Sequence, residues 1–144
     1  MNKIAAIAAV VSLIAAPIPS FAHGAPNWKV VAWESNQDTP DGLRHGTLVN
    51  INSITRSYGD LVSYQEAHSF IDDKNLPMNR AGVPINPEEL TAYLRVRDCK
   101  TNEYLHGSTF RSVDGSIEVK QLTTWDSVPA GSFRVVQNFV CSKR

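Results

Sequence analysis

The chain has 144 residues, of which 19% are charged, and its 14 basic side chains are balanced by 14 acidic ones. The charges are interspersed, so we expect no basic face of the kind that attracts nucleic acid. The length is that of one domain with a single hydrophobic core.

The first 22 residues have the pattern of a secretory signal peptide. Lys3 gives a positive start, residues 4–16 are uncharged and apolar, and small residues precede a cleavage site after Ala22. This run is too short and wrongly flanked for a membrane span, and no other stretch is apolar enough to cross a bilayer. We expect residues 23–144 to form a single exported domain, either periplasmic or at the cell surface.

The next hundred residues alternate between apolar and polar side chains and are rich in Val, Ile, Tyr and Thr. This pattern predicts strands at residues 27–35, 47–54, 61–71, 90–99, 104–113 and 116–122. Short turns such as Asp114-Gly115 join them, whereas parallel pairing would need long crossovers. We therefore predict a single twisted antiparallel sheet of about six strands.

Residues 72–89, "DDKNLPMNRAGVPINPEE", hold three prolines and little periodicity. They are predicted to form the longest loop, and long loops in compact domains tend to be functional or mobile. The acidic pairs Asp72-Asp73 and Glu88-Glu89 bracket this loop without the spacing of a calcium site, which favours a solvated acidic loop.

The tail, residues 132–141, changes period. Phe133, Val136 and Val140 fall at i, i+3 and i+7, as on one face of a helix that begins with Ser132 as its N-cap. Branched residues such as Val135 favour a strand instead, and both readings stay open. With a short C-terminal helix, the fold class is α+β and mainly β.

The two cysteines, Cys99 and Cys141, allow one pairing. Export places them in an oxidising compartment, where a disulfide forms and persists. The absence of a C-x-x-C spacing disfavours a redox or metal-binding thiol pair. A bridge at Cys141 would anchor the terminal segment onto one face of the sheet.

Four stretches in order point to a known family: "WKVVAW", "VNINSITRSYGDLVSY", "YLRVRDC" and "WDSVPAGSFRVVQNFVC". Together with the cysteine placement they resemble the surface-adhesin protein E family of small exported bacterial proteins, over nearly all of the mature chain. The resemblance implies a six-stranded antiparallel sheet with a C-terminal helix tethered to its concave face by a disulfide. It also implies binding of host proteins such as vitronectin and laminin. Two departures are Asn50, where the family often carries aspartate, and the missing cysteine that holds the adhesin's lipid.

Three arginines are candidate binding residues. Arg95 and Arg97 share one face of a predicted strand, and Arg111 lies on the next strand. Such a row suits an acidic partner or a sulfated glycan, although a plain solvent face fits the same pattern.

Two kinds of chemistry compete with binding. Cleavage after Ala22 would leave His23 with a free α-amino group, and its two nitrogens together suit Cu(II). A copper carrier or oxidative enzyme would add a ligand from His45, His68 or His106. His106 and Ser108 are spaced for contact, but no glycine elbow or orienting acid accompanies them. We therefore expect a non-enzymatic exported binding protein without a cofactor, with extracellular or host proteins as partners and copper binding through His23 as the alternative.

Overall fold

The computed structural model describes residues 25–34, 38–56, 59–106, 110–113, 116–118 and 124–143. Two helical elements occur among them, the 3-10 helix η1 (Pro87–Glu89) and the α-helix α2 (Ser132–Ser142). The strands are β1 (Trp28–Glu34), β2 (Arg44–Arg56), β3 (Leu61–Ile71), β4 (Pro77–Met78), β5 (Ala92–Asp98), β6 (Glu103–His106), β7 (Phe110–Val113), β8 (Ser116–Glu118) and β9 (Thr124–Ser127).

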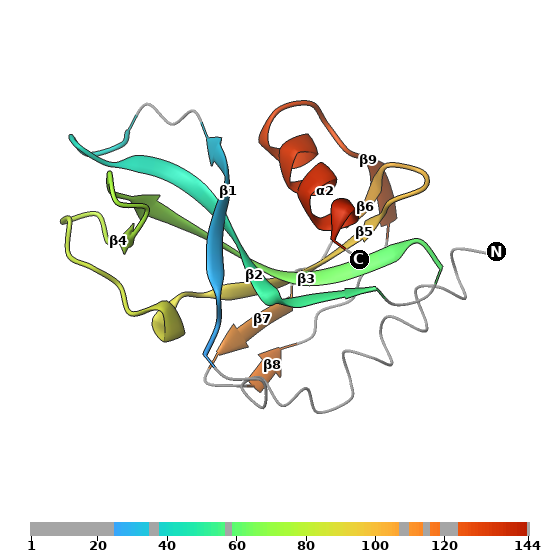
Figure 1. Ribbon diagram of the computed structural model, residues 1–144, viewed down its shortest axis with the longest axis horizontal. Helices are drawn as coiled ribbons and strands as arrows, with labels where there is room; N and C mark the ends of the chain where they lie inside the picture. Colours follow the sequence, from blue (N-terminus) through green and yellow to red (C-terminus); the bar gives the residue numbers. More distant parts are fainter. Residues whose placement is uncertain are drawn as a thin grey trace.

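The strands form one antiparallel sheet in the order β1-β2-β3-β5-β6-β9, which confirms the predicted fold class. Of the nine strands in the described residues, six lie on this path. The other three are short: β4 pairs with β3, β7 with β5, and β8 with β7. Figure 1 shows α2 lying over one face of this strongly twisted sheet.

Most strand boundaries follow the sequence pattern. β3 has the predicted bounds, whereas β2 begins three residues earlier than expected and continues to Arg56. The register of β2 against β3 shifts between Asn50 and Thr55, where Ser53 Oγ accepts a hydrogen bond from the backbone N–H of Gln65 at 2.7 Å. The predicted strand 104–113 is divided into β6 and β7, which pair with different parts of β5. β9 was not predicted.

Residues 132–141 form a helix, so the helix prediction for the tail is confirmed and the strand alternative is wrong. Its N-cap is Gly131 with φ +89° and no side-chain cap, so the prediction of Ser132 as N-cap is wrong by one residue. A positive φ favours glycine, which explains this cap. Val136 and Val140 of the predicted apolar face are buried, whereas Phe133 is 45% exposed. The β-branched residues are accepted in the helix because tertiary packing outweighs their weak helix propensity.

Both faces of the sheet carry apolar clusters. On the helix side, α2 packs with Ala32, Val49, Val62 and Tyr64. On the opposite side, a second cluster is formed by Leu48, Ala67, Ile71 and Leu90, with Trp28, Val30, Trp33 and Ile85 packed against it. Successive strand residues point to opposite faces, which is why neighbours such as Leu48 and Val49 serve different clusters.

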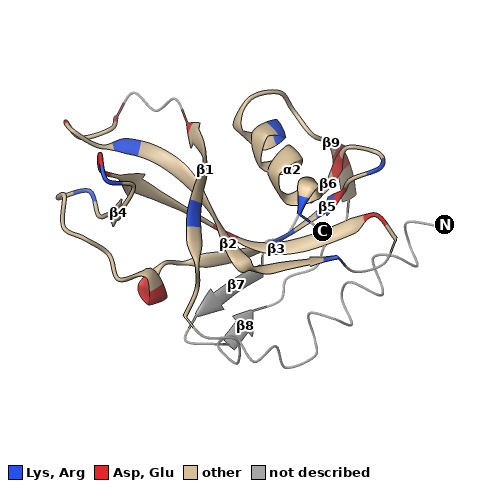
Figure 2. Ribbon diagram, in the orientation of Figure 1, with Lys and Arg blue, Asp and Glu red and all other residues tan. Residues whose placement is uncertain are grey.

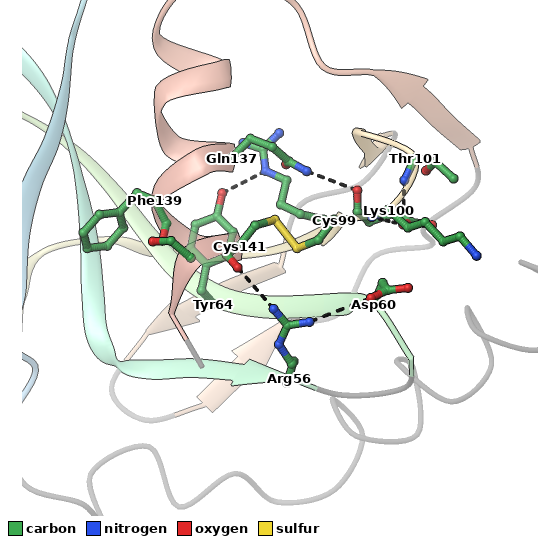
Figure 3. The surroundings of a disulfide bond; sticks show 12 residues. Arg56, Asp60, Tyr64, Cys99, Lys100, Thr101, Gln137, Phe139 and Cys141 are labelled. Atoms are coloured by element: carbon green, nitrogen blue, oxygen red, sulfur yellow. Dashed lines mark hydrogen bonds and ion pairs between the residues drawn. A yellow bond between two sulfur atoms is a disulfide. The ribbon is translucent and has the colours of Figure 1, made fainter.

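The predicted disulfide between Cys99 and Cys141 joins the end of β5 to the last turn of α2, with the two Cα atoms 5.6 Å apart. Gln137, one turn earlier, donates from Nε2 to the Asp98 carbonyl at 3.1 Å, and Arg56 Nη2 donates to the Cys141 carbonyl at 3.1 Å (Figure 3). The helix is therefore anchored to the sheet by one covalent bond and two side-chain hydrogen bonds.

Charges are dispersed over the described elements, with basic and acidic positions on both halves of the sheet (Figure 2). Within the same residues, no helix is both long enough and apolar enough to span a bilayer.

Removing the bridge tests its contribution to stability. Cys141→Ala should lower the free energy of unfolding by about 4 kcal/mol, because the unfolded chain regains the freedom of a loop of roughly 43 residues. Urea denaturation of the oxidised wild type and the variant measures the difference, and wild type under a thiol reductant is the matched control. Coincident denaturation curves for the variant and the oxidised wild type would contradict the anchoring role.

Candidate functional site

The helix side of the sheet carries a row of ionisable side chains on four adjacent strands. Glu34 comes from β1 and lies opposite His45 on β2. The remaining members come from alternate positions of β3 and β5, and alternation keeps them on one face. We call this group the charged cluster: Glu34, His45, Glu66, His68, Arg95 and Arg97.

Glu66 is the centre of the charged cluster and is only 5% exposed. Its carboxylate accepts hydrogen bonds from His68 Nε2 at 2.9 Å, Arg95 Nε at 3.2 Å and the Tyr64 hydroxyl at 3.0 Å, and Arg97 Nη2 lies 3.9 Å away. Burial opposes ionisation, but the His68 hydrogen bond and the Arg95 charge outweigh it and lower the pKa of Glu66 to about 2. The carboxylate is therefore ionised at neutral pH.

Tyr64 links Glu66 to Arg97. Its hydroxyl donates to Glu66 Oε1 and accepts from Arg97 Nε at 3.0 Å. Burial, reinforced by the negative charge of Glu66, raises the pKa of Tyr64 well above its ordinary value. The phenol therefore stays protonated, and its hydroxyl links Arg97 to Glu66 through two hydrogen bonds rather than acting as a base.

His68 bridges two carboxylates. Its Nδ1 lies 3.0 Å from Glu34 Oε1 and its Nε2 lies 2.9 Å from Glu66 Oε2. A neutral imidazole donates from one nitrogen only, so the protonated ring satisfies both contacts better. Burial favours the neutral ring, but the hydrogen bond and charge of Glu66, together with the charge of Glu34, raise the pKa of His68. Burial likewise opposes ionisation of Glu34, while the Thr47 hydroxyl and the histidine charges lower its pKa.

Arg97 is held in an aromatic surround. Its guanidinium carbon lies 6.0 Å from the ring centre of Tyr64, 5.4 Å from that of Tyr104 and 5.6 Å from that of Phe133. Phe133 belongs to the first turn of α2 and packs on Tyr104 at 5.8 Å between ring centres. The helix therefore covers this arginine, which is only 3% exposed.

This burial corrects the predicted arginine row. Arg97 is neither an exposed contact for an acidic partner nor part of a solvent face, because α2 covers it and Glu66 neutralises it. Arg95 is half-buried, bonded to Glu66 and placed over the Tyr93 ring. Arg111 lies opposite Tyr93 in the β5–β7 pairing, and its side chain falls outside the described residues.

A small cavity lies between the charged cluster and the first turn of α2. Its volume is about 20 Å³, enough for one water molecule. Arg97 Nη1 is buried and has no hydrogen-bond partner among the described residues. The lining combines cluster residues and helix residues: Glu34, Thr47, Glu66, His68, Arg97, Ser132, Phe133 and Val136.

Residues 72–89, which we call the arm, are more ordered than the predicted loop. Three turns follow one another seven residues apart, and each begins with an Asx residue whose Oδ1 accepts a hydrogen bond from the N–H two residues later. These bonds join Asp72 to Lys74 at 3.0 Å, Asn79 to Ala81 at 2.9 Å and Asn86 to Glu88 at 3.1 Å. The acidic residue Asp72 thus forms a turn, which explains it without a metal.

The first two turns are tight three-residue hairpins. Asn75 and Gly82 occupy equivalent places with φ of +62° and +78°, the left-handed conformation that such hairpins require. The next residues, Leu76 and Val83, are 49% and 54% exposed. In the third turn the equivalent residue, Leu90, is buried in the core. The repeat therefore presents two apolar side chains to solvent and buries the third.

The two alternative chemistries depend on residues that the structure does not describe: His23, Ser108 and the His106 side chain lie outside the described residues. His45 and His68 do come together, with stacked rings 6.3 Å apart. Even so, the described part of the chain contains no group of three or more side chains arranged to hold a metal ion.

Comparison with known proteins places the chain near none of them: no family model, no curated protein and no solved structure matches it.

The charged cluster yields a stability prediction. Glu66→Gln should lower the free energy of unfolding by about 3 to 5 kcal/mol, because Arg97 is left buried without its counter-charge. Adding Arg97→Met should restore part of the loss, since no uncompensated charge remains. Urea denaturation of the wild type, both single variants and the double variant measures this coupling. Strictly additive losses would rule it out.

His68 gives the cluster a pH dependence. Because its pKa is raised in the folded protein, its contribution to stability is complete below its unfolded pKa of about 6.5 and is lost as pH rises through the folded value. The stability advantage of wild type over His68→Gln should therefore shrink as pH increases above neutrality. Denaturation at a series of pH values measures it, and an advantage that is constant with pH would refute the bridging role.

Proposed function

We propose that the protein is an exported, non-enzymatic binding protein that contacts extracellular or host proteins through the arm. Residues 1–22 act as its signal peptide in this proposal. The Cys99–Cys141 disulfide supports export, because such bonds persist in oxidising compartments.

The arm carries the proposal through one observation: a hydrogen-bonded double hairpin holds Leu76 and Val83 exposed. In each hairpin the Asx Oδ1 also accepts from the N–H of the exposed residue, at 2.8 Å for Leu76 and 3.0 Å for Val83. A segment already fixed in one conformation loses little entropy on binding, so more of the contact energy appears as affinity. Exposed apolar side chains of this kind suit a protein partner.

The charged groups support binding rather than catalysis. Glu66, His68 and Arg97 are engaged with one another, and Tyr64 is held protonated between two of them. Groups fixed in this way stabilise the fold. Through the resemblance in the sequence, vitronectin and laminin are the first partners to test.

Binding to immobilised vitronectin and laminin tests the proposal. The double variant Leu76→Asp/Val83→Asp should weaken binding at least about tenfold, because truncated interface anchors typically cost 2 kcal/mol or more. Surface plasmon resonance measures the affinities, and unchanged melting temperatures show that the variants fold.

Val135→Asp is the matched control, because Val135 is as exposed as Leu76 but lies on α2. It should bind like the wild type. Equal affinity of the arm variant and the wild type would remove the arm from the interface, and absence of wild-type binding to both proteins would remove these partners.

A further inference from the structure

Two histidines on neighbouring strands share the carboxylate of Glu34, the last residue of β1. His45 Nδ1 on β2 lies against Glu34 Oε2, and His68 Nδ1 on β3 lies 3.0 Å from Glu34 Oε1. The three side chains are between 21% and 31% exposed, so protons from the solvent reach them. Three strands are therefore tied together through imidazoles, which change charge near neutral pH.

The end of β1 is a short ladder at the edge of the sheet. β1 comes first in the sheet order, and β2 is its one partner among the described strands. The register shifts between Val30 and Ala32, which separates the last three pairs, those of Ala32, Trp33 and Glu34, from the rest of the ladder. Local opening is easiest where few contacts hold a segment. The tie from Glu34 to β3 therefore adds to the stability of this end.

His68 cannot keep its contacts in both charge states. When it is protonated, Nδ1 donates to Glu34 and Nε2 donates to Glu66, which lies 2.9 Å away. When it is neutral, only one nitrogen has a proton. Glu66 is 5% exposed and Glu34 is more open, and a more deeply buried carboxylate loses more when a donor is withdrawn. The remaining proton therefore stays on Nε2, and the bare Nδ1 turns a lone pair toward Glu34.

Thr47 gives the released carboxylate a replacement. The residue is buried, and its hydroxyl oxygen lies 2.9 Å from Glu34 Oε1 and 3.4 Å from His68 Nδ1. A hydroxyl has one proton and rotates toward an available acceptor. While His68 is protonated, only the carboxylate accepts that proton. Once Nδ1 is bare, the ring accepts it, so Glu34 leaves without stranding a buried donor.

The other charged groups of the cluster keep their charge while His68 titrates. The pKa of Glu66 is about 2, and Arg95 and Arg97 of β5 are permanently protonated, so all three stay ionised between about pH 5 and 9. The side chains that α2 brings to this place are uncharged: Ser132, Phe133 and Val136. Among these neighbours, only His45 changes charge in the same range.

His45 responds differently from His68. Its Nδ1 touches Glu34 alone, so a neutral ring with its proton on Nδ1 keeps this contact. The ring meets Phe70 edge-on at 5.6 Å between centres, and Arg80 of the arm lies 5.8 Å from the centre of that phenyl ring. Deprotonation of His45 therefore weakens the attraction to Glu34 without reversing it.

We propose that Glu34, Thr47 and His68 form a pH switch that fastens the end of β1 to β3 while His68 is protonated and releases it when His68 is neutral. On release, the Thr47 hydroxyl turns from the carboxylate to the ring, and the Glu34 carboxylate turns to solvent. Because the pKa of His68 is raised, the fastened state is complete below about pH 6.5 and is lost as pH rises through the folded value. The switch needs no partner, so it does not depend on the proposed function of the arm.

NMR of the mature chain between about pH 5.5 and 9 tests the switch, because the ¹⁵N shifts of a histidine ring reveal which nitrogen has the proton. Neutral His68 should have its proton on Nε2. The backbone amide signals of Trp33 and Glu34 should shift with the same midpoint as the His68 ring. A neutral His68 with its proton on Nδ1, or amide signals that do not follow its titration, would overturn the proposal.

His68→Gln should abolish the pH-dependent shifts of Trp33 and Glu34. His45→Gln is the matched control, because it removes the other imidazole from the same carboxylate, and it should leave those shifts centred on the His68 midpoint. A dispersed amide spectrum shows that each variant is folded. The reverse result would assign the response to His45 and refute the switch.

Thr47→Val should let neutral His68 take its proton on either nitrogen, because the donor that favours a bare Nδ1 is gone. Thr47→Ser keeps a hydroxyl and should keep the proton on Nε2. The same proton position in Thr47→Val as in the wild type would contradict the part assigned to Thr47.

Discussion

The arrangement of this protein depends on the attachment of α2 to the end of β5 by the Cys99–Cys141 bridge. A single sheet has two faces, and the helix covers one of them. Once the helix is held there, its first turn lies over Arg97 and removes that side chain from solvent. A buried guanidinium needs a counter-charge and hydrogen-bond partners, and this requirement accounts for the charged cluster beneath the helix.

Glu66 meets this requirement and organises its neighbours in turn. Its carboxylate forms ion pairs with two arginines and one histidine. The Tyr64 hydroxyl in turn holds Arg97 by accepting a hydrogen bond from its Nε. A small cavity lined by Glu66 and Arg97 lies beside these pairs at the start of α2. The same helix position that makes the ion pairs necessary therefore also creates the small polar cavity.

The arm and the charged cluster differ in physical character. The arm presents apolar side chains on a backbone fixed by Asx turns, which suits a protein surface. The charged cluster holds polar groups that are paired with one another beneath α2, which suits a role in stability.

The sequence by itself determined the elements that follow from local pattern. Alternation located β1, β3 and β5, and counting the cysteines gave the only possible disulfide. The helix in the tail was one of two readings, since helical spacing and β-branched residues favoured different answers. In residues 72–89 the seven-residue recurrence of Asp72, Asn79 and Asn86 was present in the sequence, but three prolines masked it as an irregular loop.

Only the tertiary structure decided what the polar residues do. Strand alternation put Arg95 and Arg97 on one face, yet it could not tell which face the helix would cover. Glu66 and His68 are two residues apart in a strand, and their partners come from positions 34, 95 and 97, which local pattern does not connect. Burial and long-range pairing depend on how strands far apart in the chain meet, so the charged cluster and its cavity became visible only in the folded protein.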